Sequence, residues 1–573
     1  MPKISNSSPR HRARTVCIRC HSCKVRCDLD SHQRGVCSRC ERQGYECQPH
    51  IGPRKQRKAL RTSLATPHSE APPLESPVST TTQQVTPWPD VERSRTINCS
   101  ATNNAFYADV PNFITGGDFV LEVSHATRLP PPMITQALSD FYFKELFPLV
   151  PVLDHEQSGL QDSILLQQSL CFAGSIMRQS TEPAEWSPSM IYGRVKMLLF
   201  LRHDPAPFHM LTSLCILGTW LPYEPEAIVL DNPWQWTGMA IRLALQLRLH
   251  EEETYTSLQH PGRVRRIWWY LFNNDTMQMA CSGRPGMFPL KETRTRLPVA
   301  SDFDNQDTGA WVFCHLTSLC KLLRKVLEDG QADKSSPEEV YQTLDELSLW
   351  RQNLPSNLQL FDRSGETRKT YNRLVVELHI FYLVTTILTS FLGRRDNPSL
   401  LKYASMAASS CISRLYEEIL LHEEATYLLP IHSWAHLVAA TPRAFSDSDT
   451  LNEERAHELE VSHQVLDKLS EKHTSAVMIK GRIDMLNSSG LGAFPPQADA
   501  MWDSLPAPIL DDKKRRVLSL FHFPDNYCPT LDLLSSTGSI GGNQQLDSTF
   551  MDNNAVDWSV DWSSFLFDGA MSF

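Results

Sequence analysis

Apolar residues recur at helical spacing in several long segments of the chain, and polar stretches separate these segments. Ile134, Leu138 and Phe141 fall three to four positions apart, which places them on one face of a helix. Residues 234–250 and 265–285 show the same pattern. Further helical patterns lie near 310–330, 337–353, 369–393, 401–421 and 451–486. Alternating strand patterns are nearly absent, so the sequence predicts a large all-α region.

Seven of the fifteen cysteines lie between residues 17 and 47. The N-terminus has no apolar signal-peptide core, so we expect an unsecreted protein in a reducing compartment, which favours thiolate–metal sites over disulfides. The spacing C-x2-C-x6-C occurs twice, at an offset of twenty residues, in Cys17, Cys20, Cys27, Cys37, Cys40 and Cys47. Six thiolates close two zinc tetrahedra if two of them bridge, so the repeat predicts a structural site for two zinc ions.

Cys23 is the odd member of this cluster. Its counterpart at the twenty-residue offset is Gln43, which leaves Cys23 outside the predicted ligand set. It shares a helical face with Cys20 and Cys27, so an alternative ligand register stays open. The other eight cysteines, from Cys99 to Cys528, are scattered singly, and we expect them to be buried or idle thiols.

Charge is distributed unevenly along the chain. Residues 1–62 hold 15 Lys and Arg against 4 Asp and Glu, a balance of +11, so the rest of the chain carries −21 of the total of −10. A basic head of this kind is expected to bind a polyanion such as double-stranded DNA. The segment between the second and third repeat cysteines is cationic, and its counterpart in the second half is nearly neutral. We therefore expect the first half to face DNA.

Within the first half, Lys24 is the candidate for reading bases, because a short helix can present it to guanine N7 and O6 in the major groove. Arg19 and Arg26 are expected to contact phosphates, which position a protein without reading sequence. His21 lies in the same cationic segment and is a further candidate for contact with DNA.

Residues 17–47 resemble the fungal zinc binuclear cluster family of DNA-binding domains. The resemblance implies two zinc ions bridged by Cys17 and Cys37, base reading by Lys24 and a CGG triplet as the target. The chain departs from the family pattern at Cys23, where a basic residue is usual, and at Val36, where a proline is usual. These departures leave open the contacts beside Lys24 and the conformation of the loop between the halves.

Arg54 and Lys55 belong to the basic run "GPRKQRK", residues 52–58. This run fits a nuclear import signal, a contact with the DNA backbone or a solvated linker. "KKRR", residues 513–516, is a second and weaker import candidate. No sustained heptad follows the cysteines, so binding as a monomer and homodimerisation through the helical body both stay open.

The helical body resembles the fungal transcription factor middle homology region. The segments "YFKELFPLVPVLD", "TGMAIRLALQLRLH" and "RRIWWYLF" carry the resemblance, which covers about 137–310 closely and continues loosely to about 445. It implies a regulatory role, with a small-molecule inducer as one partner. Trp268, Trp269 and Phe272 are expected to pack in the core rather than form a ligand cage. No apolar run reaches about 18 residues, so we expect no membrane span.

The C-terminal residues 517–573 contain seven Asp and no Lys or Arg. Trp558, Trp562 and Phe565 lie at i, i+4 and i+7 among these acids, a pattern typical of activation segments that bind transcriptional coactivators. An inert tail and a terminal helix docked on the body are the alternatives.

The predicted fold is a small two-zinc, six-cysteine cluster, a disordered linker, a large all-α regulatory domain and a disordered acidic tail. The predicted function is a nuclear, sequence-specific activator of RNA polymerase II genes in a fungal metabolic or secondary-metabolite pathway. The alternatives are a repressor with the same head and an enzyme with an appended zinc module, although no Gly-rich phosphate loop or zinc-protease motif is present. The expected boundaries are a disordered basic arm (1–16), the cluster (17–47), a basic and then Pro/Ser/Thr-rich linker (48–130), the all-α domain (131–445), a further helix (446–490) and the tail (491–573).

Overall fold

The structure is a computed structural model, and the chain divides into two units, Met1–Asn103 and Asn104–Phe573. Each unit is described by itself. The described residues are 17–22, 25, 27–29, 36–45, 47–48, 114–155, 160–178, 184–221, 228–332, 336–362, 364–392, 398–444, 452–488, 507–524, 527–528 and 530–531.

The second unit is helical throughout its described part, apart from an isolated bridge between Phe361 and Arg368. This confirms the predicted all-α body. Its α-helices are α4 (Ile114–Val123), α5 (Pro132–Phe141), α6 (Ile164–Met177), α7 (Pro188–Phe200), α8 (Pro207–Leu217), α9 (Pro233–Gln246), α10 (Pro261–Ser282), α11 (Thr308–Ala332), α12 (Pro337–Gln352), α13 (Arg373–Leu392), α14 (Pro398–Leu421), α15 (Ile431–Ala444), α16 (Asn452–Ser470), α17 (Thr474–Ser488) and α18 (Ala507–Leu518).

Local sequence signals set several of these helix ends. Pro233 occupies the first turn of α9, and the side chain of the preceding Asn232 accepts a hydrogen bond from the Gln235 amide. Ser336 and Glu339 form a reciprocal capping box at the start of α12. Gly283 adopts φ +62° directly after α10, a conformation that favours glycine and ends the helix.

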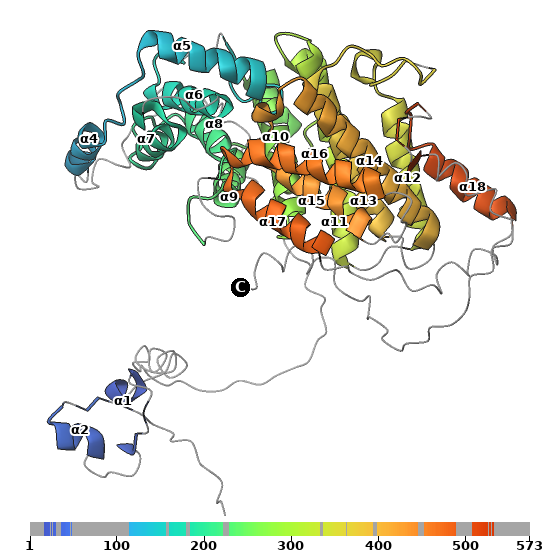
Figure 1. Cartoon of the computed structure of the whole chain (residues 1–573). Coiled ribbons are helices and arrows are strands. Elements are labelled where there is room, and N and C mark those ends of the chain that lie inside the picture. Colours follow the sequence, from blue (N-terminus) through green and yellow to red (C-terminus); the bar gives the residue numbers. More distant parts are fainter. Residues whose placement is uncertain are drawn as a thin grey trace, which may run out of the picture. The chain divides into compact units, whose positions relative to one another are not determined.

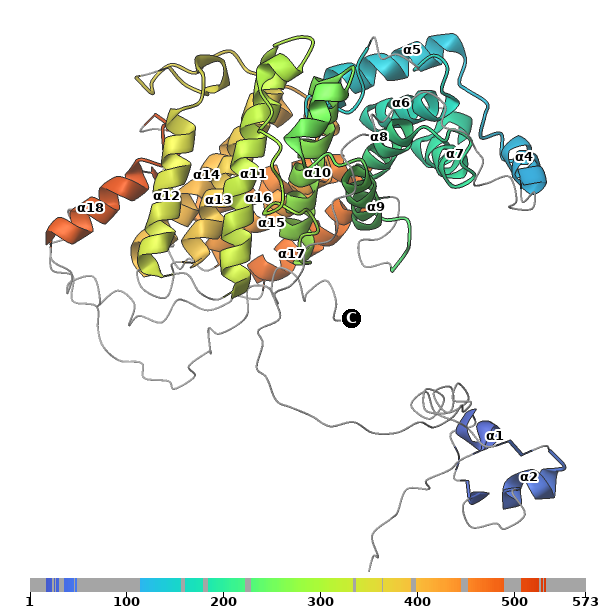
Figure 2. The same cartoon turned by 180° about the vertical axis from the view of Figure 1, so that it is seen from behind.

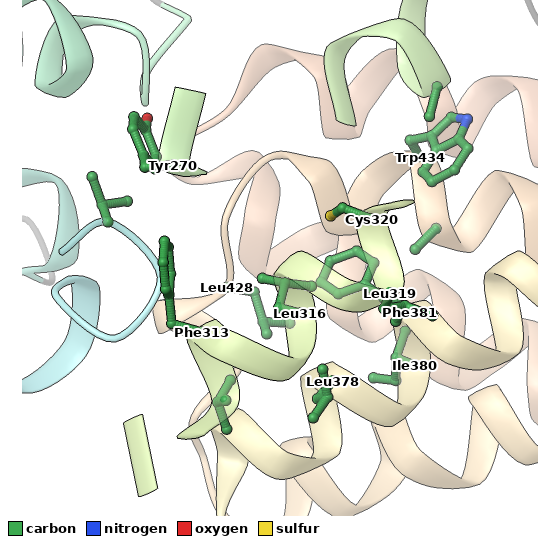
Figure 3. Packing of buried hydrophobic residues seen from close by; sticks show 14 of the residues in the cluster. Tyr270, Phe313, Leu316, Leu319, Cys320, Leu378, Ile380, Phe381, Leu428 and Trp434 are labelled. Atoms are coloured by element: carbon green, nitrogen blue, oxygen red, sulfur yellow. The ribbon is translucent and has the colours of Figure 1, made fainter. Parts of the chain in front are cut away.

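The helices of the body form two groups around one continuous core. Helices α5 to α9 gather at one end, and α10 to α17 form the larger bundle beside them (Figures 1 and 2). Helix α13 packs on both α11 and α14 and lies at the centre of the larger group. Figure 3 shows side chains of α10, α11, α13 and α15 meeting in this core, among them Tyr270, Phe313 and Phe381, all of which are buried.

Helix α13 is long and apolar enough to cross a membrane by length and composition alone. In the folded body, however, 89% of this stretch is buried against other parts of the protein, which is the environment of a core helix. Its hydroxyl side chains donate to carbonyls one turn earlier, as Thr385 does to Phe381 and Thr389 to Thr385. These bonds satisfy the hydroxyl donors within an otherwise apolar core.

A cluster of ionic contacts joins the start of α13 to Glu145, which lies in the turn directly after α5. Arg373, which is 5% exposed, bonds to the carboxylates of Glu145 and Glu377. His432 is fully buried and contacts Glu377 at 3.2 Å, and its other ring nitrogen lies 2.8 Å from the Tyr416 hydroxyl. The charges in this cluster are paired, as buried charges must be to avoid a large desolvation cost.

The predicted core role of Trp268, Trp269 and Phe272 is confirmed. Their exposed fractions are 0%, 3% and 0%, and all three rings lie within 6.3 Å of the Phe288 ring. They are core side chains packed on one another, with no ligand cage among them.

Some predicted boundaries are wrong. Helix α4 and the first turns leading into α5 fall inside the predicted linker 48–130. The predicted helix 451–486 is two helices, α16 and α17, because the chain turns at residues 471–473. Helices α6, α7, α8 and α15 were not expected from helical spacing.

The prediction that 491–573 is wholly a disordered tail is wrong for residues 507–524, 527–528 and 530–531. Here α18 and the segment after it dock on α12 and α14, at the end of the bundle where Figures 1 and 2 both place α18. Val517 and Leu520 are fully buried, and the Leu520 carbonyl accepts a hydrogen bond from the Tyr382 hydroxyl at 2.9 Å. We call the described residues 507–524, 527–528 and 530–531 the C-terminal clasp.

The clasp also contains the basic run 513–516. Arg516 binds Glu338 at 3.1 Å and Asp345 at 2.8 Å, both on α12, and its guanidinium lies 5.2 Å from the centre of the Tyr341 ring. Arg515, in contrast, is 76% exposed and pairs with Asp512 on the same helix. The second candidate for a nuclear import signal thus lies on a helix, and at least one of its basic side chains, Arg516, is held by contacts within the body.

Candidate metal centre

The first unit is built from two short helices, each of which begins directly after a cysteine. Helix α1 (Ile18–Ser22) follows Cys17, and α2 (Ser38–Gln43) follows Cys37. In each case the next repeat cysteine, Cys20 or Cys40, lies three residues further on, one helical turn away. The C-x2-C spacing therefore places both sulfurs of a pair on the same side of a helical turn.

Four cysteine sulfurs converge between these helices. The Sγ atoms of Cys17, Cys20, Cys37 and Cys40 all lie within 4.8 Å of one another, and all four residues are at most 1% exposed. Three sulfur pairs are separated by 3.8 Å: Cys17–Cys37, Cys17–Cys40 and Cys20–Cys37. A tetrahedral zinc ion with Zn–S bonds of about 2.3 Å requires sulfur–sulfur edges of about 3.8 Å. The sulfur set thus fits zinc.

The third cysteine of each half closes the same local loop. The Cys17 amide donates to Cys27 Sγ and the Cys37 amide to Cys47 Sγ, each at 3.3 Å. The twenty-residue repeat therefore extends from the sequence to the hydrogen bonds. The amides stabilise negative charge on sulfur, which is the form of cysteine that binds metals.

Contacts outside the sulfur set join the two halves. Asp28 accepts a hydrogen bond from the Ser38 amide at 3.0 Å and another from the Ser38 hydroxyl, which places a carboxylate at the start of α2. The Arg19 guanidinium lies 3.4 Å from the centre of the Tyr45 ring. The sequence predictions missed both contacts, because each joins residues at least ten positions apart through side chains that no spacing rule links.

The structure describes only some of the candidate DNA-contact residues. Arg19 is exposed on α1 and lies over Tyr45, as described above. The backbone of His21 belongs to α1. The remaining candidates lie outside the described residues: Cys23, Lys24, Arg26, Arg54 and Lys55.

Two further groups of residues that could carry function are the acidic run 302–307 in the body and the predicted activation residues near the C-terminus. Asp302, from the acidic run 302–307, is 7% exposed and binds Arg296 and Arg265. Asp302 is therefore part of the packed structure of the body. The predicted activation residues Trp558, Trp562 and Phe565 lie beyond the part of the chain that the structure describes.

Two protein families match the chain. The fungal Zn(2)-Cys(6) binuclear cluster domain matches residues 15–58, and the fungal specific transcription factor domain matches residues 140–376. The chain thus combines a fungal zinc-cluster domain with a fungal specific transcription factor domain. Proteins with these domains are zinc-cluster DNA-binding transcription regulators, not enzymes, and the cluster binds two zinc ions.

Relatives of this zinc-cluster factor are also transcription regulators. It is 25% identical to the acetamidase regulatory protein of Aspergillus fumigatus over 338 residues, which cover 55% of this chain and 42% of the relative. It is 26% identical to cutinase transcription factor 1 alpha of Fusarium vanettenii over 270 residues, 41% of this chain and 29% of the relative.

A third relative is the fusaric acid cluster transcription factor FUB12 of Gibberella moniliformis, 22% identical over 266 residues, 41% of this chain and 38% of that protein. The zinc-cluster factor thus spans well under half the length of these relatives. No solved structure matches the chain.

Proposed function

We propose that this chain is a nuclear, sequence-specific DNA-binding transcription factor whose first cluster half enters the major groove. The observation that carries the proposal is the convergence of four buried sulfurs at 3.8 Å edges within a repeated fold. Such a closed sulfur site is structural and leaves no open position for catalysis. A unit of this size needs the metal to hold its shape, and the excess of positive charge in residues 1–62 favours a polyanionic partner.

The ligand assignment that fits the edges shares Cys17 and Cys37 between two zinc ions. One ion is held by these two residues with Cys20 and Cys27, and the other by the same two with Cys40 and Cys47. Cys17–Cys37 is then the edge common to both tetrahedra, while Cys20–Cys37 and Cys17–Cys40 are edges of one tetrahedron each, which accounts for all three 3.8 Å separations.

Zinc content tests this assignment. Full-length protein should carry two zinc ions per chain, and Cys23→Ser should keep both, because its sulfur is not among the proposed ligands. Cys17→Ser removes a ligand from both tetrahedra and should lose both ions and the fold of the cluster. Elemental analysis after gel filtration gives the stoichiometry. Loss of zinc from Cys23→Ser would show that the ligand register is wrong.

DNA binding tests the function itself. We expect full-length protein to bind a duplex containing CGG more tightly than a scrambled duplex, with Lys24 reading a G·C pair. Lys24→Ala should keep two zinc ions and lose roughly 1–3 kcal/mol of that discrimination. Arg54→Ala is the matched control: it should weaken binding to both duplexes alike and reduce the salt slope by about one. Equal losses on both duplexes for Lys24→Ala would remove it from the base-reading role.

We further propose that the factor activates transcription through its acidic, aromatic C-terminus. A reporter assay with residues 540–573 fused to an unrelated DNA-binding domain should show activation, which should fall when Trp558, Trp562 and Phe565 become alanine. Silence of the intact fusion would contradict the activation role. Repression by the full-length protein at its own sites would favour the alternative, a repressor with the same head.

The target genes are proposed from the relatives. Their names refer to acetamidase, cutinase and the fusaric acid cluster, so genes of nutrient breakdown or of a secondary-metabolite cluster are the proposed targets. A genome-wide map of binding sites tests this, and sites confined to genes outside both classes would contradict it.

A further inference from the structure

Two buried thiols meet where the C-terminal clasp docks on the body. Cys411 lies in α14 and Cys528 in the clasp, and their Sγ atoms are 3.9 Å apart. Both side chains are shielded from solvent, with exposed fractions of 0% and 1%. The two residues are 117 positions apart in the sequence, so their contact depends entirely on the docking of the clasp.

Neighbouring contacts fix the two segments in register. The hydroxyls of Ser410 and Thr530, next to the two cysteines, lie 2.9 Å apart. On the other side, the rings of Phe523 and Tyr527 lie 5.8 Å and 5.7 Å from the Phe361 ring. The sulfurs are therefore held at van der Waals contact, and a movement of about 2 Å would bring them to the S–S bond length of ~2.05 Å.

Other body cysteines have different surroundings. Within the described part of the body, the Cys411–Cys528 contact is the one in which two sulfurs lie against each other. Cys320, for example, is also fully buried, in α11, and packs among apolar side chains of the core. This contrast supplies a matched control, because both kinds of thiol are equally shielded from solvent.

We propose that Cys411 and Cys528 form a reversible disulfide that locks the C-terminal clasp onto α14, with a hydroperoxide as the oxidant. The bond would hold α18, with its basic run 513–516, against the acidic side chains of α12. The inference rests on the body alone and does not depend on the zinc cluster or on DNA binding.

The chemistry requires the clasp to open before it locks. Burial raises the pKa of the Cys411 thiol well above its ordinary value, so Cys411 is protonated and unreactive while the clasp is docked. When the clasp lifts, the Cys528 thiolate attacks the O–O bond of the hydroperoxide, which yields a sulfenic acid and releases an alcohol or water. As the clasp returns, and before Cys411 is buried again, the Cys411 thiolate attacks that sulfur, the S–S bond forms, and the sulfenic oxygen takes up protons and leaves as water. A dithiol reductant reverses the reaction.

Peptide mapping of the full-length, zinc-loaded protein tests this. After treatment with tert-butyl hydroperoxide in excess zinc, digestion should release a linked peptide pair containing Cys411 and Cys528. Hydrogen exchange of residues 511–524 should slow at least tenfold in the oxidised protein, and dithiothreitol should restore the original rate. The slowing is expected because a locked clasp can no longer open locally.

Variants separate the proposed bond from general oxidation. Cys528→Ala should abolish both the linked pair and the slowing of exchange. Cys411→Ala should have the same two effects, and it serves as the second test if Cys528→Ala does not fold. Cys320→Ala should keep both effects. The proposal is overturned if the wild-type protein yields no such pair while other cysteines are oxidised. It is equally overturned if exchange slows in the variants that lack the pair.

Discussion

A close approach between two helices in the body predicts a severe effect of one added methyl group. Gly174 lies in α6, where a Cβ atom would sit 1.8 Å from the Leu138 carbonyl oxygen and 2.5 Å from its carbon, both in the backbone of α5. Ordinary carbon–oxygen contact requires about 3.2 Å, so Gly174→Ala must push the helices apart by more than an ångström. Because the obstacle is backbone, no side-chain rotation can relieve it.

The cost follows from the packing around this contact. Leu138 is fully buried, and α6 is buried over most of its length, so a separation of α5 from α6 opens gaps along their interface. Overpacking of this kind costs roughly 1–3 kcal/mol, and more when both sides are backbone. We therefore expect at least 2 kcal/mol of destabilisation, on the order of a thirtyfold loss in the folded-to-unfolded ratio.

Gly193 provides the matched control. It lies inside α7, the helix that packs beside α6, and a Cβ atom there would meet nothing within 4 Å. Gly193→Ala should therefore stabilise the body by about 0.5–1 kcal/mol, because alanine loses less backbone entropy in a helix. Urea unfolding of the full-length variants, followed by far-UV circular dichroism, measures both changes. Wild-type or greater stability of Gly174→Ala would refute the reasoning, and equal changes in both variants would show that helix propensity alone decides.

Three further predictions concern charged groups in the body. Arg516→Glu should speed proteolysis of the clasp about fivefold, because it breaks two ion pairs to α12, whereas Arg515→Glu, with its exposed side chain, should leave the rate unchanged. Arg373→Met should destabilise the body by about 3–5 kcal/mol in urea unfolding, because it removes the buried positive charge that bonds to both Glu145 and Glu377. Burial lowers the pKa of His379 to about 4, below the unfolded value of about 6.5, so its neutral form stabilises the fold above pH 6.5 and this contribution falls as the pH drops. About 2 kcal/mol should be lost between pH 7 and pH 5, and His379→Gln should flatten that part of the stability profile.

The metal centre was the most predictable part of the molecule, because ligand geometry translates directly into spacing. Two cysteines three positions apart must share a helical turn, and a repeated triplet must build the same loop twice. The structure shows this duplication in the paired amide bonds to Cys27 and Cys47. What the spacing could not give was the contact between the halves, where Asp28 meets Ser38 through a side chain with no fixed place in the repeat.

Helices with one apolar face were also found from sequence, whereas α6, which is buried on nearly all sides, was not. The spacing rule depends on a contrast between a core face and a solvent face. Helix α6 has almost no solvent face: even Gln168 and Ser169 are fully buried, and their polar atoms bond to the Arg128 carbonyl and to Ser213. Without an exposed polar face the periodic signal disappears, although the helix itself is among the most enclosed in the body.

The docking of the C-terminal clasp was also not predicted from the sequence, here because the segment looks too polar to be packed. Helix α18 is rich in charge and carries the run KKRR, so its own composition favours a solvated segment. The side chains that hold it, Glu338 and Asp345, lie about 170 positions earlier in the chain. Two buried anchors, Val517 and Leu520, are too few to produce a pattern, yet they suffice when α12 and α14 present a complementary surface. Such a segment is ordered because the surface of the body binds it, not because its own sequence favours a helix. Arg516→Glu removes contacts with that surface and leaves the helix propensity nearly unchanged. Faster proteolysis of this variant would therefore show that docking, rather than helix formation by α18 alone, orders the clasp.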